Sequence, residues 1–256
     1  MTDQYLSQTP LLDFEAPPIQ RLIADRGWLS LSQTDRIGAA YDFVRNEILF
    51  GYNSDDALPA SKVLADGYGQ RNTKGTLLMA LLRALYVQCR FHGFTIDKRL
   101  QRGVVPELVY PLAPRNIIHS WVEIFHDGQW LNLEGFILDA PVLAALQGAF
   151  PERQSLCAYG AGTDCLQDPN VEWREASTYI QKTGINHDFG KFDDPDAFYE
   201  NHRQLSGVKG VLYRLIVRHW MNHRVKKMRI GHVPTIPGGE ANLVPVQSNF
   251  QTREAI

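Results

Sequence analysis

Apolar residues recur at helical spacing in the first third of the chain and predict three helices. In residues 32–48 the apolar positions fall on one face at intervals of three and four, and Ser32 suits the N-cap position. A short helix is predicted over residues 59–64, ending near Asp66-Gly67. A longer helix is predicted from about residue 71 to Tyr86, and its leucines cover more than half of its circumference, so it should be buried.

Alternating apolar positions then predict three strands. The strands are expected at residues 88–96, 120–125 and 129–133. Asp127-Gly128, between the last two, is a strong signal for a two-residue hairpin. Helices followed by a run of strands indicate an α+β fold, with the core domain spanning residues 32–140.

The flanking regions are less regular. Residues 1–31 carry several prolines and are predicted to form an extended lead-in. Residues 141–233 are expected to form an extension packed on the core, with a short helix near residues 142–150 and irregular structure over residues 157–205. The tail, residues 234–256, has weak patterning and is predicted to be partly flexible.

A helix is predicted over residues 208–230, and it is rich in basic residues. Its apolar set is expected to pack on the core; the set comprises Val208, Val211, Leu212, Leu215, Ile216 and Trp220. The basic end could contact an anionic surface or a nucleic acid. Cations near a helix C-terminus are also stabilised by the helix dipole without any partner, and this structural interpretation is the favoured one.

Composition narrows the class of protein. The net charge is −2, which disfavours a general polyanion binder, so no nucleic-acid partner is expected. The three cysteines cannot all pair, and the first residues lack the features of a secretory signal, so a reducing cytoplasm is the expected compartment. No apolar run is long enough to span a bilayer, so no membrane partner is expected. No cofactor and no metal are predicted, and the oligomeric state stays open.

His119 and Glu134 form the first candidate for chemistry. If Asp127-Gly128 is the hairpin tip, His126 faces Gln129 and His119 lies diagonal to Glu134 on the same face. A loop placed one position earlier would make the two residues directly opposed. In either register a carboxylate beside an imidazole can fix its tautomer and stabilise its charged form, which is the orienting role in acyl-transfer triads. The alternative is a structural cross-strand polar pair.

The segment from Gly67 to Leu85, which contains Gly69-Gln70-Arg71-Asn72, resembles the nucleophile segment of the transglutaminase-like superfamily. The segments around His119 and Glu134 resemble that superfamily's histidine and acid segments, in the right order, and the resemblance covers residues 35–140. It implies a papain-like core of helices packed on an antiparallel sheet, here with a C-terminal helical extension. The superfamily carries a Cys-His-Asp triad, so Arg71 stands where it has cysteine, and Glu134 stands where aspartate is usual.

Arginine cannot replace a thiolate, because the guanidinium group stays protonated and has no nucleophilic lone pair. The favoured hypothesis is a non-thiol enzyme that acts on a small carboxylate- or amide-containing substrate by proton transfer, elimination or cyclisation. Arg71 would bind an anionic group, His119 would move the proton and Glu134 would orient it. Further polar contributors would be Gln70, Tyr68 and Tyr52.

Two alternatives stay open. The site could be catalytically silent, in a binding or scaffold protein whose Arg71 is ion-paired to Glu134 or another acid and plugs the cleft. The protein could also be an amide hydrolase or acyltransferase that uses another nucleophile, although structural roles are expected for Cys89, Cys157 and Cys165. An enzyme should leave His119 reachable from a cleft, whereas a plugged site should show an ion pair between Arg71 and Glu134.

Overall fold

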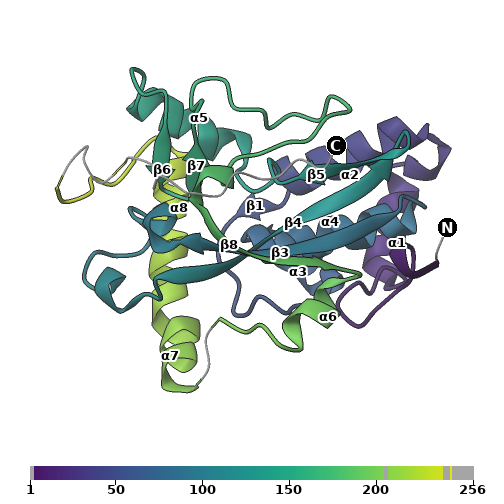
Figure 1. Ribbon diagram of the computed structural model, residues 1–256, viewed down its shortest axis with the longest axis horizontal. Helices are drawn as coiled ribbons and strands as arrows, with labels where there is room; N and C mark the ends of the chain where they lie inside the picture. Colours follow the sequence, from purple (N-terminus) through teal and green to yellow (C-terminus); the bar gives the residue numbers. More distant parts are fainter. Residues whose placement is uncertain (1–2, 205–206, 239–242, 244–256) are drawn as a thin grey trace.

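A four-stranded antiparallel sheet in the order β5-β4-β3-β8 forms the centre of the molecule (Figure 1). This computed structural model describes residues 3–204, 207–238 and 243. The strands of the sheet are β3 (Cys89–Asp97), β4 (Asn116–His126), β5 (Gln129–Leu133) and β8 (Ile185–Phe192). The predicted strands are confirmed, with β4 starting earlier than the alternation indicated.

Helices of the first half form a layer on one side of this sheet, in which the last helix makes the direct contacts with β3 and β4. They are α1 (Pro17–Asp25), α2 (Gln33–Asn46), α3 (Ala60–Asp66) and α4 (Arg71–Ala84). The three helices that periodicity predicted are therefore confirmed. Ser32 caps α2 by accepting from the amide of Asp35 at 3.2 Å, and α3 ends at Gly67, whose φ of 69° favours glycine.

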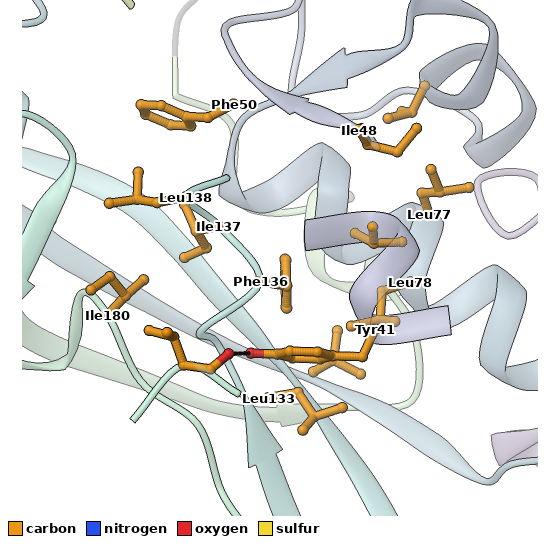
Figure 2. Close-up of a cluster of buried hydrophobic side chains, with 14 of the residues drawn as sticks. Tyr41, Ile48, Phe50, Leu77, Leu78, Leu133, Phe136, Ile137, Leu138 and Ile180 are labelled. Atoms are coloured by element: carbon orange, nitrogen blue, oxygen red, sulfur yellow. Dashed lines mark hydrogen bonds between the residues drawn. The ribbon is translucent and has the colours of Figure 1, made fainter. Parts of the chain in front are cut away.

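Helix α4 is the central element of the core. It packs against β4 and is covered by α2 and α3, and every residue from Arg71 to Arg83 is buried. Figure 2 shows Leu77 and Leu78 of α4 among side chains from α2 and from the chain that follows β5. In this cluster the hydroxyl of Tyr41 hydrogen bonds to the carbonyl of Val171 (2.7 Å) and to the hydroxyl of Thr178 (3.0 Å). The core thus ties the early helices to residues beyond 170.

The β4–β5 hairpin has the register that was predicted with Asp127-Gly128 at its tip. His126 pairs with Gln129, and Val122 pairs with Leu133. Asp127 and Gly128 have φ values of 47° and 81°, as a two-residue type I′ turn requires.

Two segments differ from the expectation. Residues 17–25 lie within the predicted extended lead-in but form α1, because the prolines occupy its first turn, where proline is tolerated. Residues 185–192 lie in the region expected to be irregular but form β8, which pairs with β3. Its pattern escaped recognition because its outer positions are polar and its pairing is interrupted by register shifts.

The remaining elements are short. They are the parallel pair β1 (Leu49–Phe50) and β2 (Tyr68–Gly69), the hairpin β6 (Leu156–Ala158) and β7 (Ala161–Thr163), and the helices α5 (Ala140–Ala149) and α6 (Pro195–Tyr199). Single 3-10 turns lie at Asp3–Tyr5, Trp28–Ser30, Lys98–Gln101, Tyr110–Leu112 and Lys182–Gly184. Helix α5 confirms the short helix predicted there.

The long C-terminal helix is present, but its predicted orientation is wrong. It runs as α7 (Gly207–Leu212), a π-helical turn (Tyr213–Val217) and α8 (Arg218–Arg229). All six apolar residues expected to pack on the core are exposed, from 41% for Leu212 to 85% for Val208. The opposite face is the one turned inward; it comprises Gly210, Tyr213, Val217, Met221, Val225 and Met228.

Within the described residues, no helix is long and apolar enough to cross a membrane. Cys89, Cys157 and Cys165 form no disulfide among the described residues; Cys89 and Cys157 are buried and Cys165 is exposed. Most of the tail that was predicted to be flexible lies outside the described residues.

Candidate functional site

The N-terminus of α4 meets the edge of β4 beyond the end of β5. Gln70 is the N-cap residue and Arg71 the first residue of the helix. The Nε of Arg71 donates to the carbonyl of Ile118 at 3.0 Å, and the side-chain amide of Asn72 donates to the same carbonyl at 3.3 Å. The hydroxyl of Ser120 donates to Asn72 at 3.0 Å. The backbone on both sides of His119 is therefore fastened to this helix end.

His119 and Glu134 are in direct contact, as predicted. The Nε2 of His119 lies 2.6 Å from Oε1 of Glu134, and both side chains are completely buried. The other oxygen of Glu134 accepts the backbone amides of Ile180 and Gln181, each at 2.9 Å. Glu134 therefore holds His119 and also fastens the segment around residue 180 to the sheet.

The surroundings of His119 keep it neutral. Burial lowers the pKa of His119; Glu134 opposes this shift and the charge of Arg71 adds to it. With the Nε2 proton donated to Glu134, Nδ1 carries the lone pair, and no described residue hydrogen bonds to Nδ1. The pair therefore has the protonation state of a base.

Strand alternation places His119 on the face of β4 away from α4. Ser120 faces α4, whereas Trp121 belongs to a second, smaller apolar cluster. The ring of Phe94 in the same cluster lies 6.2 Å from that of His119, centre to centre. The imidazole is thus enclosed by the sheet and by this cluster.

A cavity of about 410 Å³ lies at the start of α4. Arg71 and Gln70 contribute to its wall, together with the loop after β1, the segment before β4 and helices α6 to α8. Its apolar lining residues include Val105, Val109, Leu112, Ile117, Val217 and Met221. His119 and Glu134 do not line it.

Two tyrosine hydroxyls at this cavity are unsatisfied. Tyr52 and Tyr199 are 3% and 4% exposed and both line the cavity, yet their buried hydroxyls have no hydrogen-bond partner in the described part of the chain. Burial raises the pKa of each phenol, and the nearby charge of Arg71 lowers it, so both remain protonated donors. Among the described residues, the only hydrogen bond from the Arg71 side chain is the one from Nε, so its two terminal nitrogens have no described partner.

The described residues show neither of the two arrangements that the sequence predicted, an open cleft that reaches His119 or an ion pair between Arg71 and Glu134. Among the described residues, Arg71 forms no ion pair with Glu134, so it does not plug the site in the predicted way. His119 is not reachable from the cavity, because its side chain has no exposed surface. Arg71 lies at the cavity wall and its charge reaches both His119 and the tyrosines.

The other predicted contributors have different positions. Gln70 lines the cavity, but its amide donates to Asp56 at 2.9 Å and its oxygen accepts the amide of Asn53 at 2.7 Å. Tyr68 is half-buried and is not part of the wall. Burial raises the pKa of Asp56, although Gln70 and Arg71 oppose the shift.

Several wall residues carried no signal in the sequence. They are Asp55, Asp56, Tyr199, Arg203, Lys209, Tyr213 and Arg214. Tyr199 and Arg203 come from residues 157–205, where the pattern predicted irregular structure. Lys209, Tyr213 and Arg214 come from the helix predicted over residues 208–230, which the sequence did not place near Arg71. None of the cysteines lines the cavity.

One group of described side chains has the geometry to hold a metal ion, away from this cavity. The Nε2 of His126 lies 3.7 Å from a carboxylate oxygen of Asp127 and 3.6 Å from one of Glu175. Both carboxylates are largely exposed, at 77% and 58% of the side chain, and such groups are common without an ion.

Comparison with known proteins agrees with the resemblance. Residues 27–135 match the model of the transglutaminase-like superfamily. This match covers less than half of the chain and supports the resemblance to the superfamily, and the fold is α+β, with helices packed on an antiparallel sheet and a C-terminal helical extension. Among solved structures, it is similar to a candidate cysteine protease from Cytophaga hutchinsonii, with 13% identity and a TM-score of 0.43. That match covers 75% of this chain and 47% of the other chain. No curated protein matches it.

Proposed function

We propose that this protein binds a small amphiphilic anion in the cavity, with Arg71 as the anchor, and that it does so without thiol chemistry. The observation that carries the proposal is the group of unused donors at the cavity wall. These donors are the terminal nitrogens of Arg71 and the hydroxyls of Tyr52 and Tyr199.

The energetic argument starts from the cost of leaving these groups unpaired. A buried hydroxyl without a partner costs about 1–3 kcal/mol. A carboxylate or phosphate group can accept from both hydroxyls and from the two terminal nitrogens of the guanidinium group. The first amides of α4 and its dipole also favour an anion at this place. Apolar residues on the same wall, such as Ile117 and Met221, suit the apolar part of such a ligand.

The burial of His119 favours binding over catalysis. A general base must lie within hydrogen-bond reach of the proton that it removes. His119 has no exposed surface and does not line the cavity, so a ligand held by Arg71 would not touch it. In this proposal the pair of His119 and Glu134 stabilises the fold. The proposal therefore differs from the enzyme hypothesis that the sequence favoured.

A non-thiol acid/base enzyme remains the second candidate, and one observation favours it. Nδ1 of His119 has no described partner, and the lowered pKa keeps the imidazole neutral and able to accept a proton. This function requires a movement of Arg71 that connects His119 to the cavity. The alternative based on another cysteine has less support, because no cysteine lines the cavity.

The test is a binding titration with linear carboxylates and alkyl phosphates of increasing length, by calorimetry and by thermal shift. Wild-type protein should bind more tightly as the apolar chain grows. Tyr52→Phe and Tyr199→Phe should each weaken binding about 10- to 100-fold, because each removes one hydrogen bond to a charged group. The same variants should be as stable as wild type or more stable without ligand, because each removes an unsatisfied hydroxyl.

Tyr213→Phe is the matched control. Tyr213 also lines the cavity, but its hydroxyl already donates to the carbonyl of Asn53 at 3.1 Å. This variant should lose stability and keep most of its affinity for the anion. Arg71→Gln should abolish binding, and His119→Gln should preserve it. Turnover of a bound anion that is lost in His119→Gln would favour the enzyme instead, and binding that is equal in wild type and Arg71→Gln would contradict the proposal.

A further inference from the structure

The C-terminal helix carries an apolar stripe that nothing in the described structure covers. The stripe consists of Val208, Val211, Leu212, Leu215, Ile216 and Trp220. Their exposed fractions lie between 41% and 85%, although a buried stripe on the opposite face already attaches the helix to the body. A large contiguous apolar patch on a protein surface marks a contact with a partner, a ligand or a membrane.

The charge of this segment is strongly one-sided. Residues 207–239 contain seven Lys and Arg residues and no Asp or Glu. Since the whole chain has a net charge of −2, the remaining residues together carry −9. Within the segment, Lys209, Arg214, Lys226 and Lys227 are exposed beside or beyond the apolar stripe. The surface that the stripe contacts is therefore expected to be negatively charged.

A second segment extends the apolar surface. Leu108 and Leu112, in the chain between β3 and β4, are 81% and 66% exposed. Leu112 and Leu212 both line the cavity, so the two segments meet at its wall. In Figure 1, α7 projects beyond the sheet at one end of α8.

We propose that the apolar stripe docks this protein on the surface of a membrane that contains anionic lipids. An interfacial helix of this kind combines an apolar face that carries Trp and Leu with flanking Lys and Arg, and it lies on the bilayer without spanning it. The apolar residues would enter the boundary between headgroups and acyl chains, and the cations would contact the anionic headgroups.

Other occupants fit less well. A two-fold dimer through this face would place the two sets of cations opposite each other. A nucleic acid would pair with the cations but leave the exposed aliphatic side chains without a partner. A protein that recognises a helix usually offers a groove to its apolar face, and the flanking cations require that such a groove be acidic. An anionic membrane surface can contact both the apolar side chains and the cations, and it needs no groove of matching shape.

The experiment is co-sedimentation of the full chain with two kinds of vesicle. One contains phosphatidylcholine alone, and the other also contains about 30% phosphatidylserine, so that about one lipid in three carries a negative charge. Wild type should bind the anionic vesicles, and binding should weaken as salt is added. Leu215→Glu with Ile216→Glu should lower the partition coefficient at least about tenfold. Lys209→Gln and Lys226→Gln should each lower it roughly fivefold on anionic vesicles.

The controls make the same chemical changes elsewhere. Leu29→Glu alters a residue of similar exposure (47%) in a turn that packs against α1, and Lys62→Gln removes an exposed cation from α3. Both should bind like wild type, and thermal unfolding should show that all variants are folded. Wild type that stays in solution with both kinds of vesicle would overturn the proposal. So would sedimentation as a dimer that Leu215→Glu with Ile216→Glu abolishes, because the stripe would then be an interface between copies.

Discussion

Replacement of Glu134 tests whether the buried pair stabilises the fold. Glu134 accepts three hydrogen bonds, from His119 and from the amides of Ile180 and Gln181. In Glu134→Ala all three donors lose their acceptor in a site that water does not reach. At about 1–3 kcal/mol for each of the three unsatisfied buried donors, the free energy of unfolding should fall by about 3–9 kcal/mol.

Glu134→Gln provides the internal comparison. The side-chain oxygen of glutamine can still accept both backbone amides, while its NH2 group faces Nε2 of His119. The imidazole can accept this hydrogen bond if its proton moves to Nδ1. Since three good contacts remain and only the charge is lost, the cost should be about 1–2 kcal/mol.

Urea unfolding followed by tryptophan fluorescence measures both values, and nitrogen-15 NMR of the imidazole reports the change of tautomer. Glu172→Ala, at a mostly exposed glutamate, is the control and should leave stability unchanged within error. The reasoning is refuted if Glu134→Ala loses less than about 1 kcal/mol, or if Glu134→Gln is as destabilised as Glu134→Ala.

Three further predictions concern charges along the same core. Burial lowers the pKa of Lys74 to about 7, against 10.5 in the unfolded chain, so the unfolded chain binds more protons between these values and stability should rise with pH. Between pH 7.5 and 9.5, the free energy of unfolding of wild type, measured by urea titration, should rise by up to about 1.4 kcal/mol per pH unit more than that of Lys74→Met. The same dependence of stability on pH in both proteins would contradict this. Arg71→Cys should produce a thiol that iodoacetamide modifies faster than Cys165 at neutral pH, because a helix N-terminus lowers the pKa of a thiol. Peptide mass spectrometry measures both rates, and slower modification at position 71 would count against an anion site there. Asp139 is completely buried and accepts a hydrogen bond from Arg229 at 2.7 Å. Asp139→Ala should therefore lower the free energy of unfolding by about 3–5 kcal/mol in urea titrations. A loss below about 1 kcal/mol would show that this pair does not hold α8 on the core.

The sequence predicted the core because its signals are local. Helix α4 has a leucine-rich pattern that only a buried helix can have, and Asp127-Gly128 determines the hairpin register that brings His119 to Glu134. Strand β8 could not be predicted, because its partner β3 lies far away in the chain and its own outward residues are polar.

The C-terminal helix shows a different limit of pattern analysis. It has two apolar stripes on opposite faces, and spacing alone cannot say which of them is buried. The π-helical turn at Tyr213–Val217 also changes the residue spacing in its middle, so a strict 3.6-residue period does not follow the buried face. At the site, the sequence predicted the contact of His119 with Glu134 but not the wall that Tyr199 and Tyr213 contribute.

The position of β8 has a consequence for the synthesis of this protein. A ribosome releases the chain from its N-terminus, so β3 leaves the tunnel almost a hundred residues before the strand that covers its edge. Until residue 192 has emerged, the nascent chain presents an unpaired edge of β3, and Glu134 lacks the amides of Ile180 and Gln181. Open strand edges pair with other chains. A truncation after the residues that match the superfamily, at 135, would keep this edge open permanently, so it should aggregate where the full-length chain folds.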